Sequence, residues 1–428
     1  MSEDSYAQLA VIDDDPTGSQ SASDVTVLLR WTRKSVERSL RDGPAYLLTN
    51  SRALAPAAAR RAVRSAASAA AGAGATRVIM RGDSTLRAHL LEEYLGWVDA
   101  VAGRPVPLLL VPALPSAGRV TVGGIHYLKR DGALIPLQQT DYSRDPRLGY
   151  STSRLADWAE ERSGGYFAAS RSREVALAAL RSSEGVNLAR ALVEQSAEPA
   201  PAVCVPDACD LDDLRLIARG MSLAEQQGAR FAVRCGPALA AVLGGRLAAG
   251  PVSAPPIKGS LLVVCGSYVE TSTRQIEAVV ERFPYSRVEV DVTMLVRSDA
   301  GAAMATALAG LMRTFKRSPV AVLTTSRSFA GEARSAGRSM LVAKRLAEVV
   351  REIAGSTAMV IGKGGVTSAV VAKHGLRGVT ARVKGPLMPG VALWNLRTAS
   401  QTMPFVVFPG NVGEPESLVN LIEAVLRG

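Results

Sequence analysis

Three consecutive carboxylates follow a short apolar segment near the start of the chain. The segment Leu9–Ile12 is followed by Asp13, Asp14 and Asp15 and then by a Pro-Thr-Gly-Ser turn. In open α/β sheets, ligands bind in the crevice outside the carboxyl ends of the strands. Adjacent carboxylates repel one another and rarely help folding, so the triplet suggests proton transfer, a metal or a cationic partner. A solvated acidic turn is the alternative interpretation.

Further polar strand ends occur in the same half of the chain. The segment 81–87, Arg-Gly-Asp-Ser-Thr-Leu-Arg, follows the apolar run Arg77–Met80, and we expect Asp83 to cap a helix there. Arg87 would then lie one helical turn beyond Asp83, where its guanidinium can bind a carboxylate. The segment 49–52, Thr-Asn-Ser-Arg, closes another strand with similar chemistry, and Arg119 lies in a further loop of this kind. A plain helix cap with a surface arginine remains the alternative for Asp83 and Arg87.

Glycine-rich turns follow the predicted strands of the C-terminal half. They are the segments 265–267, Cys-Gly-Ser, 362–368, Gly-Lys-Gly-Gly-Val-Thr-Ser, and 408–413, Phe-Pro-Gly-Asn-Val-Gly. Glycine lets a backbone approach a phosphate group closely, and a helix start supplies N–H donors. None of the three matches the Walker or the dinucleotide-binding pattern. Together they indicate a site for the phosphates of a nucleotide.

The elements that position these loops alternate between short apolar runs and Ala- and Arg-rich helical stretches. This alternation predicts an α/β fold with two domains, each with a largely parallel sheet flanked by helices. Helices are expected at Ala55–Ala71 and Arg338–Ala354, and the irregular region 113–163 is expected to form long loops. Strands are predicted at Leu9–Ile12, Val25–Leu29, Ala45–Leu48, Arg77–Met80, Pro107–Val111, Ala202–Val205, Phe231–Val233, Leu261–Val264, Arg287–Val290, Val320–Leu323 and Ala358–Ile361.

A Gly-, Ser- and Pro-rich stretch at residues 249–259 marks the clearest boundary. Its composition disfavours a helix or a central strand, so it is typical of a linker. We therefore predict an N-terminal domain over 1–248 and a C-terminal domain over 260–428.

Composition and charge narrow the class of protein. The 428 residues carry 50 Lys and Arg against 39 Asp and Glu, a net charge of +11, but the basic residues are scattered. This favours an anionic small molecule over nucleic acid. We expect no membrane association, because no apolar run approaches the roughly 18 residues of a membrane-spanning segment. Four cysteines without a Cys-x-x-Cys pair and an acidic start without a signal-peptide pattern favour the cytoplasm. A homodimer is left open.

Taken together and in this order, the motifs resemble the four-carbon acid sugar kinase family over nearly the whole chain. The resemblance depends on Asp-Asp-x-Thr-Gly at 14–18, Asp-Ser-Thr-Leu-Arg at 83–87, the loops at 115–118 and 123–127, Gly-Ser at 266–267 with Thr-Arg-Gln at 273–275, Gly-Gly-x-Thr at 364–367, Pro-Gly-Val at 389–391 and Gly-Asn-x-Gly at 410–413. It implies that the N-terminal domain binds an acid sugar and the C-terminal domain binds ATP, with the site in the cleft between them. The family's usual Gly-Gly-Asp-Thr is Gly-Gly-Val-Thr here, so the acidic contact is missing at Val366.

The resemblance and the loops together define a candidate site. The resemblance places Asp14, Thr17, Asp83, Ser84 and Arg87 against the sugar acid, and Ser267, Gly364, Gly365 and Gly410 against ATP. The same loops add Gly18, Ser51, Arg52 and Arg119 to the first group, and Lys363, Val366, Thr367 and Asn411 to the second. Phosphoryl transfer requires mainly positioning and charge neutralisation. We expect Asp14 or Asp15 to accept the proton of the sugar hydroxyl or to hold Mg²⁺, with Asp15 the candidate metal ligand, and Arg87 and Arg119 to bind the substrate carboxylate.

Two other functions remain open from the sequence. Asp13-x-Asp15-x-Thr17 also satisfies the start of the motif of haloacid dehalogenase-type phosphatases, in which the first aspartate is a nucleophile. Alternatively, the chain binds a nucleotide or another ligand without turnover, and Val366 marks the lost activity.

Overall fold

The computed structural model describes residues 8–267, 269–297, 300–326 and 336–427. The chain divides into two compact units. The first comprises residues 1–25 and 31–247, and the second comprises residues 26–30 and 248–428. The short segment 26–30 thus belongs to the second unit although it lies early in the chain, which the sequence did not indicate.

The main sheet of the first unit is parallel in every pairing that the structure describes. Most of its strands are buried along their whole length, so they are nearly continuous apolar runs, as in sheets covered on both faces. In spatial order they are β3 (Ala45–Leu48), β1 (Leu9–Asp13), β4 (Arg77–Arg81), β11 (Ala232–Cys235), β5 (Leu108–Val111), β10 (Val203–Pro206) and β9 (Arg173–Val175).

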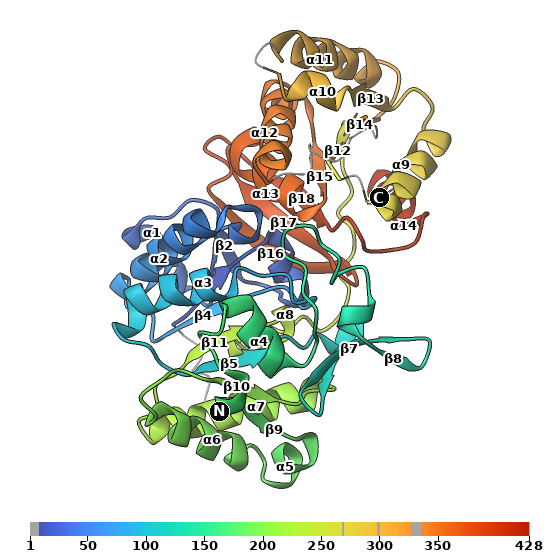
Figure 1. The fold of residues 1–428 in the computed structure, drawn as a ribbon. Coiled ribbons are helices and arrows are strands. Elements are labelled where there is room, and N and C mark those ends of the chain that lie inside the picture. The colour runs from blue at the N-terminus through green and yellow to red at the C-terminus, as the bar shows by residue number, and fades with distance from the viewer. Residues whose placement is uncertain (1–7, 268, 298–299, 327–335, 428) are drawn as a thin grey trace. The chain divides into compact units, whose positions relative to one another are not determined.

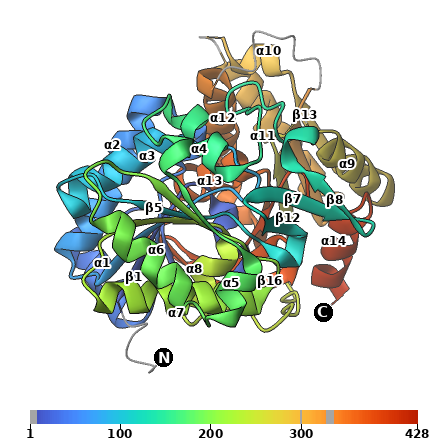
Figure 2. The same cartoon turned by 60° about the horizontal axis from the view of Figure 1, so that its bottom comes forward.

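Helices cover both faces of this sheet. Helices α2, α3 and α4 lie on one face, and α6, α7 and α8 lie on the other (Figure 2). Along the chain the helices are α1 (Arg33–Arg41), α2 (Pro56–Gly72), α3 (Leu90–Trp97), α4 (Leu155–Ser163), α5 (Leu177–Ser182), α6 (Val186–Ser196), α7 (Leu211–Gln226) and α8 (Pro237–Leu243). The helix expected at Ala55–Ala71 is therefore present as α2.

The expectation of long loops over 113–163 is wrong in part. The region contains a separate antiparallel sheet of β6 (Arg119–Val122), β7 (Ile125–Arg130) and β8 (Ala133–Pro136), labelled in part in Figure 1, and it ends in α4. Gly123 and Gly124 form the β6–β7 turn, with φ of 57° and 73°. Two consecutive residues with positive φ are the requirement of a tight type I′ hairpin, which glycine meets without strain. The Gly-Gly pair was the signal for this hairpin.

The sheet of the second unit is parallel on one side and antiparallel on the other. In spatial order its strands are β13 (Arg287–Val290), β14 (Val320–Thr325), β12 (Leu261–Cys265), β15 (Met359–Lys363), β18 (Thr402–Phe408), β17 (Val391–Arg397), β16 (Thr380–Met388) and β2 (Thr26–Leu28). The neighbours from β13 across to β18 pair in parallel, and those from β18 across to β2 pair antiparallel.

Helices also pack on both faces of the second sheet. An apolar cluster joins α9 and α14 to side chains of β12, β14, β15, β17 and β18, and α11, α12 and α13 lie on the opposite face (Figure 1). The helices are α9 (Glu270–Arg282), α10 (Val292–Leu295), α11 (Gly301–Phe315), α12 (Ala336–Ile353), α13 (Gly365–Val370) and α14 (Ser417–Arg427). The predicted class, α/β with largely parallel sheets in two domains, is confirmed.

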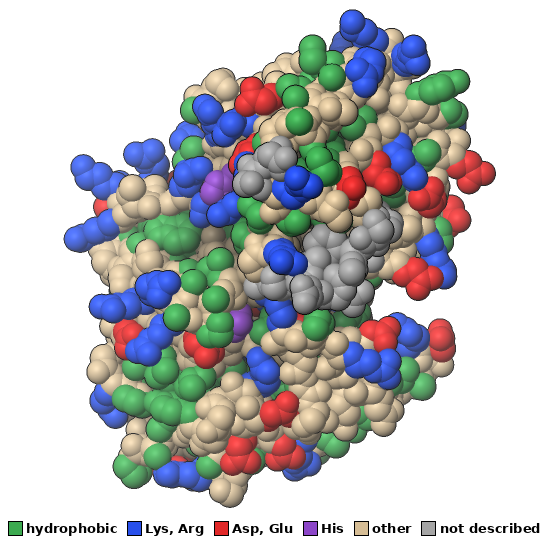
Figure 3. Space-filling view, turned by 45° about the horizontal axis from the view of Figure 1, so that its top comes forward, with side chains coloured by type: hydrophobic (Ala, Val, Ile, Leu, Met, Phe, Trp, Pro, Cys, Tyr) green, Lys and Arg blue, Asp and Glu red, His purple; other side chains and the backbone are tan. Residues whose placement is uncertain are grey.

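The surface and the helices show two further features. On the face drawn in Figure 3, Lys and Arg side chains are interspersed with acidic and uncharged ones. Among the described residues, no helix is both long and apolar enough to cross a bilayer.

Candidate functional site

The order of the strands places the aspartate triplet at a topological switch point. From β1 the sheet continues to β3 on one side and to β4 on the other. At such a point the loops that leave neighbouring strands diverge, and a crevice opens at their carboxyl ends. Asp13 is the last residue of β1, and Asp14 and Asp15 follow it directly. The ends of β3 and β4 contribute Ser51, Arg52 and Asp83 beside them.

Asp15 is held by its neighbours in the chain and by Arg52. Its Oδ1 accepts a hydrogen bond of 2.9 Å from the Thr17 backbone, which caps the 3-10 helix Pro16–Ser21. Its Oδ2 forms an ion pair with Arg52 Nη2, and Arg52 Nη1 lies 3.3 Å from Asp83 Oδ2. Burial alone would raise the pKa of Asp15, but the guanidinium groups of Arg52 and Arg81 lower it below its usual range. Asp15 therefore stays ionised and acts as a positioning anion for Arg52.

Asp13 is buried and pairs with Arg81, the last residue of β4. The Asp13 side chain is 1% exposed, and its Oδ1 accepts a hydrogen bond from Arg81 Nε. Burial raises the pKa of Asp13 to about 7, with Arg81 opposing the rise. A Cβ at Gly18 would overlap Arg81 Nε, so the glycine makes room for this guanidinium. Because Asp13 is enclosed and paired, its geometry does not suit the nucleophile of a phosphatase.

Asp14 differs from both neighbours because its carboxylate accepts no hydrogen bond from any residue that the structure describes. Its Oδ1 lies 3.1 Å from Arg81 Nη1, at ion-pair distance but without hydrogen-bond geometry, and its Oδ2 lies 3.9 Å from Arg234 Nη2. Burial raises the pKa of Asp14 to about 6, and the arginines, Arg81 foremost, oppose the rise. A carboxylate that is ionised at neutral pH but holds no hydrogen bond suits a general base.

The Asp83 loop is an irregular turn, so the prediction that Asp83 caps a helix is wrong. Helix α3 begins only at Leu90. Asp83 instead accepts hydrogen bonds from the backbone N–H and the hydroxyl of Thr85, as in an Asx turn, and from Arg87 Nε at 2.8 Å. Arg87 and Arg52 lower the pKa of Asp83 against the effect of burial. Arg87 does reach a carboxylate as predicted, but that carboxylate is Asp83 of the same loop.

Residues of the small sheet and its flanks hold the Asp83 loop from outside. His126 on β7 is fully buried, and its Nε2 lies 3.0 Å from the Ser84 carbonyl oxygen while its Nδ1 lies 2.9 Å from Thr121 Oγ1. Burial lowers the pKa of His126 to about 4, so the ring is neutral at physiological pH and Nε2 donates to Ser84. Tyr150 donates a hydrogen bond of 2.9 Å to the Thr85 carbonyl. The sequence had assigned His126 no role in the site.

Ser51 is turned toward the interior. Its side chain is fully buried, and its hydroxyl donates a hydrogen bond of 2.6 Å to Glu93 Oε1 on α3. Glu93 Oε2 in turn pairs with Arg234 at the end of β11. The predicted contact between Ser51 and a substrate is therefore not supported, and Ser51 belongs to a buried chain of hydrogen bonds that ends beside Asp14.

Three charged residues of this network were missed from the sequence. They are Arg81, Glu93 and Arg234, all buried. The available signal was an arginine directly following apolar strand residues at the end of β4 and within β11. Charged residues are almost never fully buried unless they are paired, so an arginine in such a run predicts a buried partner.

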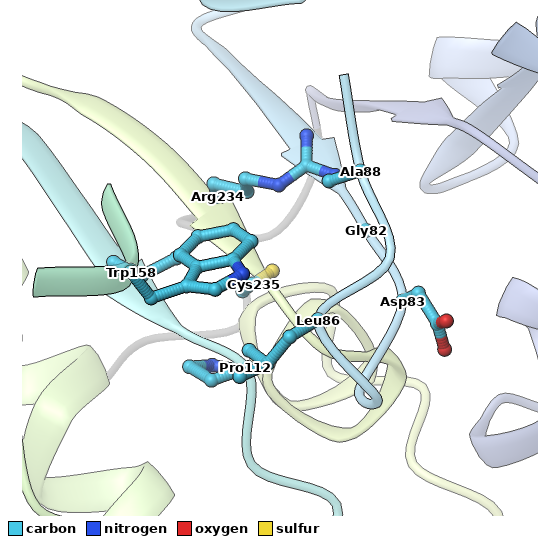
Figure 4. Close-up of a pocket in the computed structure, with 9 residues that line it drawn as sticks. Gly82, Asp83, Leu86, Ala88, Pro112, Trp158, Arg234 and Cys235 are labelled. Carbon is cyan, nitrogen blue, oxygen red and sulfur yellow. The ribbon is translucent and has the colours of Figure 1, made fainter. Parts of the chain in front are cut away.

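A small pocket lies behind the Asp83 loop (Figure 4). Its lining includes Leu86, Pro112 and Cys235, together with Trp158 and Arg234. Trp158 Nε1 and Arg234 Nη2 are buried and have no hydrogen-bond partner among the described residues. The Asp83 carboxylate points away from the Trp158 ring (Figure 4). Asp83 therefore presents its charge to Arg52 and Arg87 rather than to the pocket.

The contacts of Asp15 do not suit a magnesium ligand. Both of its oxygens are engaged, one by the Thr17 N–H and one by Arg52. Among the described residues, no group of three or more His, Cys, Asp or Glu side chains is arranged to hold a metal. Magnesium in phosphoryl-transfer sites usually takes one or two carboxylates together with substrate phosphates and water. The contacts of Asp15 therefore do not support its expected role as a metal ligand, and no chemical step is assigned to a metal ion.

The glycine turns of the second unit meet at the carboxyl ends of β12, β15 and β18. Ser272 Oγ, on α9, donates a hydrogen bond of 2.8 Å to the Gly410 carbonyl and lies 3.1 Å from Ser267 Oγ. The Gly364 N–H donates to the Phe408 carbonyl at 2.7 Å. A Cβ at Gly410 would lie 2.8 Å from Ser267 Oγ. The loops predicted to bind a phosphate therefore contact one another, with Gly410 packed closely against Ser267.

Lys363 does not point toward a ligand. Its side chain is fully buried, and its Nζ donates a hydrogen bond of 2.6 Å to the Pro409 carbonyl and lies 4.1 Å from the centroid of the Phe408 ring. Burial lowers the pKa of Lys363 to about 7. The predicted direct contact of Lys363 with ATP is not supported, and the side chain fixes the turn after β18 instead.

The remaining predicted nucleotide residues lie around the same turns. Gly364 adopts φ of 102° immediately before α13, which begins at Gly365 and contains Val366 and Thr367. Thr367 is buried, and its Oγ1 would lie 2.9 Å from a Cβ at Gly266. Asn411 is exposed in the turn after β18. Val366, in the first turn of α13, stands where the family usually has an aspartate.

Comparison with known proteins assigns the chain to a family. Two family models match it in succession. One, a sugar-binding N-terminal domain, covers residues 9–243, and the other, a nucleotide-binding C-terminal domain, covers residues 262–418. The chain belongs to the four-carbon acid sugar kinase family. This confirms the family indicated by the motifs, with the aspartate triplet in the first matched domain and the glycine turns in the second.

Among characterised relatives, the chain is 30% identical to a D-erythronate kinase from Heliobacterium modesticaldum over 302 residues. The match covers 68% of this chain and 64% of that relative, so it spans less than two thirds of the relative's length.

Solved structures confirm the fold. A Haemophilus influenzae protein has a TM-score of 0.62 at 18% identity, covering 97% of this chain and all of the other. A Salmonella typhimurium protein described as a putative tRNA synthase has a TM-score of 0.69 at 20% identity, covering 96% and 98%. At these identities the likeness concerns the fold alone.

Proposed function

We propose that this chain is an ATP-dependent kinase that phosphorylates a hydroxyl group of a four-carbon sugar acid of the tetronate or 3-oxo-tetronate type. The observation that carries the proposal is the state of Asp14, at the switch point of a sugar-binding domain. This buried carboxylate accepts no hydrogen bond within the described part of the chain. The D-erythronate kinase relative supports the same substrate class.

In the proposed reaction, Asp14 accepts the proton of the sugar hydroxyl. The oxygen then forms a bond to the γ-phosphorus of ATP while the bond from that phosphorus to the β,γ-bridging oxygen breaks, and ADP leaves. Arg81 and Arg234 face the two Asp14 oxygens. They keep the carboxylate ionised before the transfer and stabilise the neighbouring negative charge.

The remaining groups of the candidate site are proposed to bind the substrates. Arg52 bridges Asp15 and Asp83, so its guanidinium is fixed between two carboxylates. Asp83, a partly buried residue of its loop, is proposed to bind hydroxyl groups of the sugar acid. On the second unit, the turns that carry Ser267, Gly364 and Gly410 are proposed to bind the phosphates of ATP, since close glycine backbones suit phosphate groups.

The test is a screen of ATP consumption and phosphorylated product with D-erythronate, the threonates, five-carbon sugar acids and their 3-oxo forms. We expect turnover with at least one four-carbon acid. Asp14→Asn is expected to lower it by about 10²- to 10⁴-fold, whereas Asp131→Asn leaves it unchanged. Asp131 is an exposed turn residue with φ of 51°, a conformation that asparagine tolerates well, so it is a matched control.

Two results would replace the proposal. Binding of ATP without turnover of any sugar acid would favour a nucleotide-binding protein without kinase activity, the alternative connected with Val366. Hydrolysis of phosphate esters together with a phosphoryl adduct on Asp13 would favour a phosphatase.

A further inference from the structure

Two arginines from separate segments of the first unit lie against the ring of Tyr142. Arg87 lies in the Asp83 loop, Arg119 begins β6, and Tyr142 lies in the segment between β8 and α4. The Cζ atoms of Arg87 and Arg119 are 5.5 and 5.8 Å from the centroid of the Tyr142 ring. Arg119 Nη2 also donates a hydrogen bond of 3.2 Å to Tyr142 Oη. We call this group the arginine–tyrosine clamp.

The clamp carries positive charge that its surroundings compensate only in part. Arg87 pairs with Asp83, which it shares with Arg52, and its Nη1 lies a long 3.9 Å from Asp145. Arg119 forms no ion pair with a carboxylate in the described part of the chain, and its Nε is buried without a hydrogen-bond partner. Two guanidinium groups with spare donors and little counter-charge form a site for an anion.

The ring explains how two flexible arginines keep one arrangement. A guanidinium stacked on an aromatic face is attracted by the ring quadrupole and loses part of its rotational freedom before any ligand binds. Arg87 is further fixed at Nε by Asp83 and Thr85. The donors of Arg87 that remain belong to its outer nitrogen atoms, which can form paired hydrogen bonds with a planar carboxylate.

We propose that the arginine–tyrosine clamp binds the carboxylate of the substrate, and that Tyr142 is a specificity-determining residue because it holds both guanidinium groups in place. The inference rests on the proposed function and deepens it, because it explains why the substrate is an acid rather than a neutral sugar. The clamp joins the rest of the site through Arg87, Asp83 and Arg52. The acid end of the substrate and its reacting hydroxyl are thereby recognised by different groups.

The test compares D-erythronate with D-erythronamide, which keeps the hydroxyl groups and lacks the charge. In the unchanged protein we expect the acid to have a KM at least about 10-fold lower than the amide, the usual scale of a charge-assisted contact. Tyr142→Leu is expected to raise the KM for the acid about 10-fold, with little change in kcat and little change for the amide. Tyr142→Phe, which keeps the ring and loses Oη, is expected to have a smaller effect.

Controls make each result decisive. Tyr127→Leu removes a tyrosine of the neighbouring strand β7. No arginine in the described structure stacks on its ring, so both KM values are expected to stay unchanged. Equal KM increases for acid and amide after Tyr142→Leu, or no increase for either, would overturn the clamp.

The failure of the clamp and the failure of the proposed function are distinguishable. If the protein turns over no sugar acid, the proposed function fails. The acid and the amide are then compared by their dissociation constants, measured by calorimetry, in the unchanged protein and in Tyr142→Leu. A preference for the acid that Tyr142→Leu abolishes would then still support the clamp. Absence of any binding of D-erythronate to the unchanged protein would overturn it.

Discussion

Replacing Asp14 by asparagine tests the proposed base through activity and stability together. Asparagine keeps the shape of the side chain and cannot accept the hydroxyl proton. General-base catalysis typically contributes about 10²- to 10⁴-fold, so we expect kcat to fall by that factor. In the unchanged enzyme, a pKa of about 6 for Asp14 predicts that kcat/KM rises with pH up to about pH 6 and then levels off.

The same substitution has a stability effect of defined sign. The pKa of Asp14 rises from 3.8 to about 6 on folding, so between these pH values the folded state binds more protons than the unfolded state. The unchanged protein therefore loses stability as pH rises through this window, by about 3 kcal/mol at 1.36 kcal/mol per pKa unit. Asparagine does not ionise, so the variant is expected to gain that amount relative to the unchanged protein between pH 4 and pH 7.

Asp15→Asn is the matched control with the opposite sign. Folding lowers the pKa of Asp15, so ionised Asp15 stabilises the folded state above its unfolded pKa of 3.8, and the variant is expected to be less stable at pH 7. Urea titrations at pH 4, 5, 6 and 7 measure both differences in the free energy of unfolding. Near-normal kcat in Asp14→Asn, or a stability difference that falls with pH, would refute the assignment.

Three further predictions concern positioning. Lys363→Met is expected to become less stable relative to the unchanged protein as pH rises from 7 to 10.5, because the pKa of Lys363 falls to about 7 on folding; urea titrations at pH 7 and pH 9 that show no such trend would contradict it. His126→Asn is expected to raise the KM for the sugar acid and to reduce stability by about 1 kcal/mol, the usual contribution of a hydrogen bond such as that to Ser84, and an unchanged KM would argue against its positioning role. Gly18→Ala is expected to reduce the free energy of unfolding by about 1–3 kcal/mol or more through the clash with Arg81, whereas Gly301→Ala, in open space, should not, and equal effects in chemical denaturation would exclude the clash as the cause.

The α/β architecture and most of the strands were predictable from local sequence. Short apolar runs closed by polar residues are typical of buried parallel strands, and each predicted run corresponds to a strand within one or two residues. The small sheet of β6, β7 and β8 was not predicted, because its strands are half-exposed and short, so their apolar pattern is weak. The Gly123-Gly124 pair was the signal that could have revealed it.

Sequence alone indicated which strand ends are candidates for chemistry, and it determined which family the chain belongs to. Both follow from short motifs and their order along the chain, such as those that contain Asp14, Asp83 and the glycine turns. Only the tertiary structure decided how the carboxylates divide their roles. Whether an aspartate is paired, as Asp15 is with Arg52, or left without a hydrogen bond, as Asp14 is, depends on arginines from other strands. Those contacts join residues far apart in the chain, and burial sets their strength, so no local pattern could have specified them.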